Sequence, residues 1–139
     1  MAVFGIGAYY DEDVSSDFIC EECACIGYGK TEASSLYEML RRIKKGDIIY
    51  IKSYDIKNKT VLIKAVGYVI GRNIKEYHFP NSNISMGYGR KVLWKRVLEE
   101  NADWVRIPIS DEDKKNNVYQ NTLYEEYSDT VINEVLELL

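Results

Sequence analysis

The sequence predicts an α+β domain in which a small, bent, antiparallel or mixed β-barrel is flanked by helices. Ile48 to Ser53 is rich in isoleucine and tyrosine, whose side chains fit a pleated, half-buried surface. Polar residues at 57–59 predict a hairpin turn, because asparagine tolerates a left-handed backbone there. Val61 to Ile70 then runs back with apolar side chains on both faces, and Gly67 and Gly71 are places where a strand can bend. A hairpin covered on both faces is typical of a closed or nearly closed barrel.

Two helices with an apolar stripe are predicted beside this hairpin. Residues 31–45 carry apolar side chains at spacings of four and three, and Gly46 follows where a helix ends favourably. The second helix begins at Ser128, a favourable N-cap, and Asp129 suits its first turn. The stripes consist of Leu36, Leu40 and Ile43 in the first helix and of Val131, Val135 and Leu138 in the second.

The other predicted elements are shorter. Apolar or alternating runs predict strands at Val3–Ala8, Cys23–Ile26, Lys91–Leu98 and Trp104–Ile109, with Trp104 in the core. We expect one or two helical turns near 15–22, a long irregular loop over 73–89, a turn at 111–115, and a short strand or loop over 116–124.

Length and charge limit the class of protein. With 139 residues, the stretch 1–139 is expected to form a single domain. The net charge of −4 argues against bulk neutralisation of nucleic-acid phosphates, although Arg90, Lys91, Lys95 and Arg96 lie close together in the sequence. No apolar run approaches the ~20 residues that span a bilayer, and the N-terminus has the pattern of a strand rather than of a signal peptide. We therefore expect a cytoplasmic protein with no membrane partner.

Six segments occur in an order that is typical of one superfamily. They are FGIG at Phe4–Gly7, CIGYGKT at Cys25–Thr31, IKKGDIIYIKS at Ile43–Ser53, AVGYVIG at Ala65–Gly71, KVLWKRV at Lys91–Val97 and NTLYEE at Asn121–Glu126. Over nearly the whole chain, this set resembles the PUA-like superfamily, specifically the EVE-like domains. The resemblance implies a compact, bent β-barrel and a reader of nucleic acid, since several members take a modified base, flipped out of a duplex, into an aromatic-lined pocket. Members are often fused to nucleases or motor domains in DNA restriction, whereas we expect a standalone domain here.

By this resemblance, the ligand pocket lies between the end of the first strand and the strand before the long helix. Glycines there let a flat ring approach backbone N–H and C=O groups, and tyrosine faces stack a base for about 1–3 kcal/mol. In the alternative interpretation, the tyrosines pack the barrel mouth and the glycines only bend the strands. The residues concerned are Gly7, Tyr9, Tyr10, Ile26, Gly27 and Tyr28.

A second group of candidate ligand-binding residues lies between positions 88 and 95. Trp94 can stack a base while Lys91 and Lys95 hold phosphate, or else it is a core tryptophan with solvated lysines around it. Tyr88, between two glycines and followed by Arg90 and Lys91, predicts a surface loop that shapes itself around a phosphorylated ligand. The alternative is a plain loop that leads into the strand.

The sequence predicts neither a metal site nor a catalytic centre. Three cysteines at 20, 23 and 25 have the spacing C-x-x-C-x-C, but a closed zinc site needs four ligands and the only histidine, His78, is far away in sequence. Cys23 and Cys25 are expected on one face of a strand, buried and reduced. Since the sequence contains no catalytic motif, we expect a non-enzymatic protein without a cofactor. The exception to consider is a metal-dependent nuclease at the acidic stretches 11–13 or 111–113.

Two functions from different classes follow. The first is a binding module that captures a nucleobase, ordinary or modified, from DNA, RNA or a free nucleotide in an aromatic pocket. The alternative is an acidic interaction or inhibitor protein, a nucleic-acid mimic or modulator, whose protein partner belongs to a restriction or defence system. The acidic segments DEDVSSD and DEDKK favour the alternative.

Overall fold

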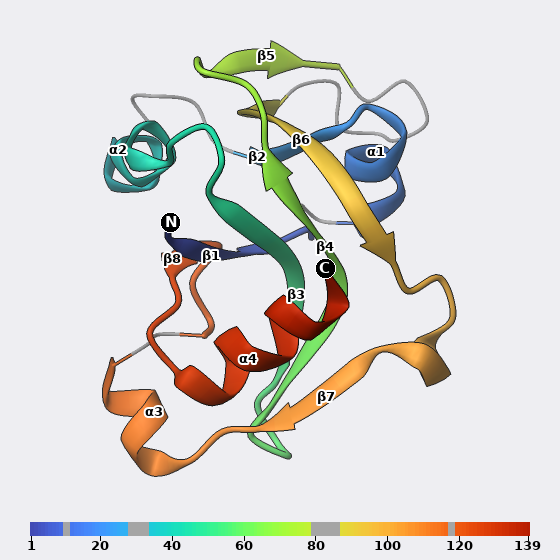
Figure 1. Cartoon of the computed structure of the whole chain (residues 1–139), viewed down its shortest axis with the longest axis vertical. Helices are drawn as coiled ribbons and strands as arrows, with labels where there is room; N and C mark the ends of the chain where they lie inside the picture. Colours follow the sequence, from blue (N-terminus) through green and yellow to red (C-terminus); the bar gives the residue numbers. More distant parts are fainter. Residues whose placement is uncertain (10–11, 28–33, 79–86, 117–118) are drawn as a thin grey trace.

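The computed structural model of the chain describes residues 1–9, 12–27, 34–78, 87–116 and 119–139 (Figure 1). It is a mixed α+β fold, as predicted, with a curled sheet at its centre. In chain order the elements are β1 (Val3–Gly7), α1 (Ser15–Cys20), β2 (Cys23–Ile26), α2 (Ser34–Arg42), β3 (Ile48–Asp55), β4 (Thr60–Val69), β5 (Lys75–Tyr77), β6 (Gly87–Val97), the 3-10 turn η1 (Asn101–Asp103), β7 (Val105–Pro108), α3 (Asp111–Asn116), β8 (Leu123–Glu125) and α4 (Asp129–Leu138).

Within the described residues, the strands form one eight-stranded sheet in the order β2-β6-β4-β3-β1-β8, with β5 paired to β6 and β7 paired to β4. The β3–β4 hairpin is antiparallel, as predicted, whereas β1 joins β3 in parallel, so the sheet is mixed. Register shifts at Ile51/Lys52 in β3 and at Val66/Gly67 in β4 mark bulges, which increase the local twist. The sheet curls into a half-barrel (Figure 1), and no pairing of described residues joins β2 to β8 to close it.

The curled sheet is covered on both faces, which explains the two-faced apolar pattern of residues 61–70. One core, which includes Phe18, Leu40 and Ile49, lies between the sheet and the helices α1 and α2. The other core, which includes Tyr50 and Val131, lies between the sheet and α4, which crosses the opposite face in Figure 1. Because successive side chains of a strand alternate, Ile49 and the next residue of β3 point into different cores.

Both predicted long helices are present. α2 ends at Arg42 rather than at 45, and Gly46 adopts a φ of 96°, the left-handed conformation expected after a helix. In α4, Ser128 is the N-cap, and its side chain accepts a hydrogen bond from the backbone N–H of Val131. Val131 and Val135 are buried, as the stripe predicted.

The sequence predicts a turn for the acidic stretch after β7, whereas in the structure this stretch forms the short helix α3. Ser110 Oγ accepts a hydrogen bond of 3.1 Å from the N–H of Asp113 and donates one of 2.9 Å to its carboxylate. This reciprocal arrangement satisfies a free N–H at the start of the helix. The acidic first turn and the two lysines of the last turn also suit the helix dipole.

Two further predictions need correction. In the β3–β4 turn, the positive φ occurs at Lys59 and not at Asn58, whose side chain instead donates to Asp55. Trp104 is half-buried rather than in the core: its indole N–H donates to Leu98 O, and Lys64 Nζ lies 4.5 Å from the ring centroid. The amphipathic indole is therefore covered by a lysine stem on its solvent side.

Candidate functional site

A small cavity of about 230 Å³ lies where β1 ends, against β3 and the segment before β8. Its polar side chains come from Tyr9, Asp13, Lys52, Ser53, Tyr54, Lys64, Gln120 and Thr122. The cavity thus combines two aromatic rings with two cations, a carboxylate, an amide and two hydroxyls, and polar groups of this kind can orient a small planar ligand.

Lys52 is the unusual member of this set, because its side chain is buried in the middle of β3. The residue is only 7% exposed, yet no ion pair to it exists among the described residues. Its ammonium donates one hydrogen bond, of 2.6 Å, to the carbonyl of Tyr119 and lies 5.6 Å from the centroid of the Tyr124 ring. Among the described residues, its other two N–H donors have no hydrogen-bond acceptor. Burial lowers the pKa of Lys52 to about 8, so the amine is still mostly protonated at neutral pH.

Gly7 keeps the space beside Lys52 open. A Cβ at position 7 would lie 3.7 Å from Lys52 Cε and 3.8 Å from Nζ, in ordinary van der Waals contact. Since Gly7 also lines the cavity, any side chain at this position occupies space next to the ammonium. A side chain at position 7 would therefore narrow the cavity beside the ammonium.

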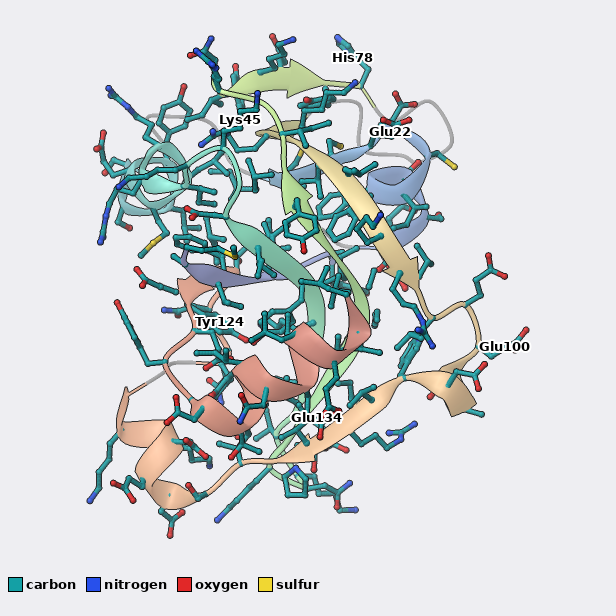
Figure 2. The ribbon with its side chains drawn as sticks, viewed as in Figure 1. Glu22, Lys45, His78, Glu100, Tyr124 and Glu134 are labelled. Atoms are coloured by element: carbon teal, nitrogen blue, oxygen red, sulfur yellow. The ribbon has the colours of Figure 1, made fainter. Side chains whose placement is uncertain are left out.

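A buried tyrosine–glutamate cluster is formed by Tyr50, Tyr119, Tyr124 and Glu126. It is joined to the cavity by the hydrogen bond between Lys52 and Tyr119. Glu126 accepts hydrogen bonds from the hydroxyls of Tyr50 at 2.5 Å and Tyr119 at 2.9 Å, and the Tyr50 and Tyr124 hydroxyls are 2.7 Å apart. Glu126 also accepts from the backbone N–H groups at 127 and 128, directly before α4. Figure 2 shows Tyr124 inside the molecule, close to α4.

This cluster fixes the position of the carbonyl that holds Lys52. Tyr119 is bound through its hydroxyl to Glu126, stacks on Tyr54 with ring centroids 5.9 Å apart, and accepts the lysine through its backbone oxygen. Burial raises the pKa of Glu126, partly offset by its hydrogen bonds. The hydroxyls of Tyr50, Tyr119 and Tyr124 are thus all hydrogen-bonded. A buried network whose members are all bonded is rigid, so it holds the Tyr119 carbonyl in place.

A second, larger cavity of about 430 Å³ adjoins the first. It is lined by Cys20, Trp104 and apolar residues of β3, β4 and β6. Asp13 and Lys64 line both cavities, and their charged groups are 3.8 Å apart. The Lys64 side chain is only 13% exposed and that of Asp13 is 58% exposed, so this ion pair is partly buried.

The structure brings together only part of the pocket predicted from the sequence. Gly7 and Tyr9 line the small cavity, and Tyr9 is 72% exposed. Ile26 instead lies in the core, fully buried, and pairs with β6, so it cannot face a ligand. Gly27 is exposed at the end of β2, and β2 and β1 are separated in the sheet by three strands. Tyr10 and Tyr28 lie outside the described residues.

The candidates on β6 divide between its two faces. Trp94 faces inward, and its indole N–H donates to the carbonyls of Phe18 and Cys23, which matches the interpretation of a core tryptophan. Lys91 and Lys95 are exposed on the outer face. A single ligand cannot be stacked on Trp94 and held by these lysines, because alternate residues of a strand point to opposite sides.

Arg90 and Tyr88 also face inward. Tyr88 is half-buried, with its ring edge-on to Tyr37 at 6.2 Å. Arg90 is only 2% exposed and donates hydrogen bonds to the carbonyls of Leu40, Ile43 and Gly71. Both interpretations of 87–91 as a loop are therefore wrong, because these residues belong to strand β6. The guanidinium of Arg90 holds the end of α2 against this strand.

The cysteines show the predicted alternation. Cys23 and Cys25 are both buried, with their sulfur atoms 3.7 Å apart, and Cys20 is exposed. In the described part of the chain, no three His, Cys, Asp or Glu side chains gather in a way that could hold a metal ion.

The chain matches no family model, and no curated protein matches its sequence. The site must therefore be interpreted from its own geometry. None of the described helices combines the length and the apolar character needed to cross a membrane.

Sequence reasoning missed Lys52, Tyr54, Gln120 and Thr122. For Lys52 a signal existed: it is the only charged residue in IIYIKSY, the apolar core of a strand that is buried on both faces. Lysine is rarely buried unless it is paired or functional. Gln120 and Thr122 had no such signal, since their place beside β3 depends on the fold.

Proposed function

We propose that this protein is a non-enzymatic binding module that captures a nucleobase, ordinary or modified, in the cavity beside Lys52. The observation that carries the proposal is the buried ammonium of Lys52, which faces this cavity without a carboxylate partner among the described residues. Nucleobases are planar and carry carbonyl oxygens and ring nitrogens on their edges. Lys52 and Gln120 offer donors for such an edge, and Tyr9 and Tyr54 offer ring faces.

The size of the cavity supports a base rather than a larger ligand. Its volume of about 230 Å³ is below the roughly 300–1,000 Å³ of pockets that enclose drug-sized molecules. A single base fits this space, whereas the sugar and phosphate of a nucleotide would extend outside it. The resemblance of six segments to PUA-like, EVE-like domains supports the same ligand class, as does the curled, mixed sheet.

Calorimetric titration with nucleosides and with the corresponding nucleotides tests the proposal. Lys52→Met should abolish measurable binding, because it replaces the ammonium by an apolar group of similar length. Lys95→Met is the matched control, since Lys95 is exposed on the outer face of β6 and should bind as the wild type does. Equal binding by the two variants would contradict the proposal.

The salt dependence of the affinity shows whether backbone phosphates of a polynucleotide are bound together with the base. If only a base is captured, raising the salt from 50 to 200 mM should change the affinity for a nucleoside or a short oligonucleotide little. A steep fall for the oligonucleotide alone would show that backbone phosphates are also bound. In that case the chain reads a nucleic acid strand rather than a free base.

The alternative, an acidic protein that covers a basic partner, has less support from the structure. Asp13 pairs with Lys64 and Ser15, and Asp17 is buried, so part of the first acidic segment is used within the fold. The exposed acids of α3, Asp111 and Glu112, remain available. Capture of a stoichiometric protein partner without any bound nucleobase would favour this alternative over our proposal.

A further inference from the structure

A polar cavity of about 420 Å³ lies between α2, β6 and the segment that joins β4 to β5, away from the Lys52 site. Three of its described lining residues are arginines, and none is acidic. The lining consists of Tyr37, Arg41, Arg72, Asn73, Ile74 and Arg90.

Arg90 is the fixed part of this cavity. Its Nη1 donates to the carbonyls of Leu40 and Ile43, the former at 3.1 Å, and its Nη2 donates to Gly71 O at 2.6 Å. Its Nε is buried and has no hydrogen-bond partner among the described residues. Of the five N–H donors of the guanidinium, two therefore remain unused: the one on Nε and one on Nη2.

These two donors are on the nitrogens with which arginine grips an oxyanion through two parallel hydrogen bonds. A buried donor without a partner costs about 1–3 kcal/mol, so it calls for an explanation such as a bound ion. The three carbonyls supply only partial negative charge, and no ion pair to Arg90 exists among the described residues. Burial lowers the pKa of Arg90, and the negative charge of Asp47 offsets part of this decrease.

Arg41 and Arg72 bring two more positive charges to the rim, where both are exposed. Arg41 has a weak partner in Glu38, 3.5 Å away with both side chains more than half exposed. Further cations lie at the end of α2, in the turn after it and in β5, namely Arg42, Lys44, Lys45 and Lys75. Figure 2 shows many nitrogen-tipped side chains around α2 and Lys45, so this end is positive although the chain has a net charge of −4.

We propose that this cavity is an oxyanion site that binds a phosphate group, with Arg90 as the buried anchor and Arg41 and Arg72 as the closing cations on the rim. The phosphate can belong to inorganic phosphate, to a phosphomonoester or to a nucleic acid backbone, because all three present the same oxygens. The proposal does not depend on the function of the Lys52 cavity.

The first test uses inorganic phosphate as the probe, with the ³¹P signal and the melting temperature as readouts at constant ionic strength. Saturable binding is expected. Arg72→Gln and Arg41→Gln, at exposed positions, should each weaken it roughly tenfold, the effect of one charge-assisted hydrogen bond. Arg96→Gln is the matched control, an exposed arginine of the same strand as Arg90 but outside the cavity, and it should bind phosphate as the wild type does.

A second titration, with a single-stranded oligonucleotide, separates the two sources of phosphate. If the site takes a backbone phosphate, Arg72→Gln should reduce the slope of log K against log salt by about one, and Arg96→Gln should not. If the oligonucleotide binds equally to both variants while inorganic phosphate still distinguishes them, the site takes free phosphate or phosphomonoesters. Either result supports the oxyanion site. Equal phosphate binding by Arg72→Gln and Arg96→Gln, or the absence of saturable binding, would overturn it.

Discussion

Lys52 Nζ donates a hydrogen bond of 2.6 Å to the backbone carbonyl of Tyr119, and this contact joins the ligand cavity to the buried tyrosine–glutamate cluster. The two residues are 67 positions apart in the sequence. The carbonyl is fixed because the Tyr119 side chain is itself bonded to Glu126. The ammonium is therefore positioned before any ligand arrives, which reduces the ordering cost of binding.

Lys52→Met should change how stability depends on pH. Burial lowers the pKa of Lys52 from an ordinary value of 10.5 to about 8 in the folded protein. Between pH 8 and 10 the unfolded chain therefore binds more protons, and the free energy of unfolding of the wild type should rise with pH. The charged lysine costs the folded state about 3 kcal/mol at pH 7. Urea unfolding at pH 7, 8, 9 and 10 should show a rise in the wild type that is missing in the variant.

The same variant tests whether Lys52 is functional or structural. If its charge serves a ligand, Lys52→Met should be more stable than the wild type at pH 7, since a buried charge is removed. The lost hydrogen bond to Tyr119 offsets part of this gain, typically by about 1–2 kcal/mol. A variant that is clearly less stable at pH 7 would mean that Lys52 mainly holds the fold together.

Replacement of the Glu126 carboxylate by an amide should be tolerated, whereas removal of the side chain should not. Glu126→Ala removes the acceptor of four hydrogen bonds, which come from the hydroxyls of Tyr50 and Tyr119 and from the N–H groups at 127 and 128. We expect a loss of about 3 kcal/mol or more in the free energy of unfolding, measured in urea. Glu126→Gln keeps an acceptor oxygen, and the Tyr50 hydroxyl can redirect its proton to Tyr124.

The pH dependence of stability distinguishes Glu126→Gln from the wild type. Because burial raises the pKa of Glu126 in the folded state, its contribution to stability is full below the ordinary pKa of the carboxyl and declines as pH rises through the folded value. Glu126→Gln should lack this decline, and its stability relative to the wild type should improve as pH increases over that window. A constant difference between the two proteins from pH 4 to 7 would contradict the assignment.

The hairpin was predictable from the sequence because its signals are local. Alternation, β-branched residues and a polar turn act over a few residues, and the pairing of β3 with β4 follows from them. The N-cap at Ser128 and the left-handed Gly46 were predictable for the same reason. These features depend on backbone sterics and nearby hydrogen bonds, so distant residues do not alter them.

The candidate sites depend instead on contacts between distant segments. Arg90 follows a glycine-rich stretch and has the pattern of a surface cation, but the fold places it against carbonyls of α2 more than 40 residues away. Ile26 lies in a predicted pocket segment, yet β2 pairs with β6 and turns this side chain into the core. Gly7 and Tyr9 were selected because the resemblance places a pocket at the end of the first strand, and both line the small cavity there.

The two glycines of β1 should respond differently to alanine. A Cβ at Gly5 would lie 2.6 Å from Tyr124 Cζ, and that ring cannot move away without breaking its hydrogen bond to Tyr50. Gly5→Ala should therefore lower the free energy of unfolding by about 1–3 kcal/mol. Gly7→Ala adds a methyl group at ordinary contact distance from Lys52 and should leave the melting temperature nearly unchanged.

Gly7→Ala should nevertheless weaken ligand binding, because its methyl group occupies cavity space beside the ammonium. A nucleoside titration should show a loss of at least about tenfold, the equivalent of 1.4 kcal/mol. If Gly7→Ala keeps both its stability and its affinity, the ligand does not approach Lys52 from the side of β1.

Tyr9 should contribute to binding without contributing to the fold. Its side chain is 72% exposed and lines the Lys52 cavity, so Tyr9→Ala removes a stacking face and little packing. We expect the affinity for a nucleoside to fall by about 1–3 kcal/mol, the value of one base–aromatic stack, and the melting temperature to stay within a few degrees. Tyr127→Ala is the matched control, since Tyr127 is 59% exposed and does not line the cavity. Should both variants bind alike, the ring of Tyr9 does not touch the ligand, and Tyr54 is the remaining described aromatic face in this cavity.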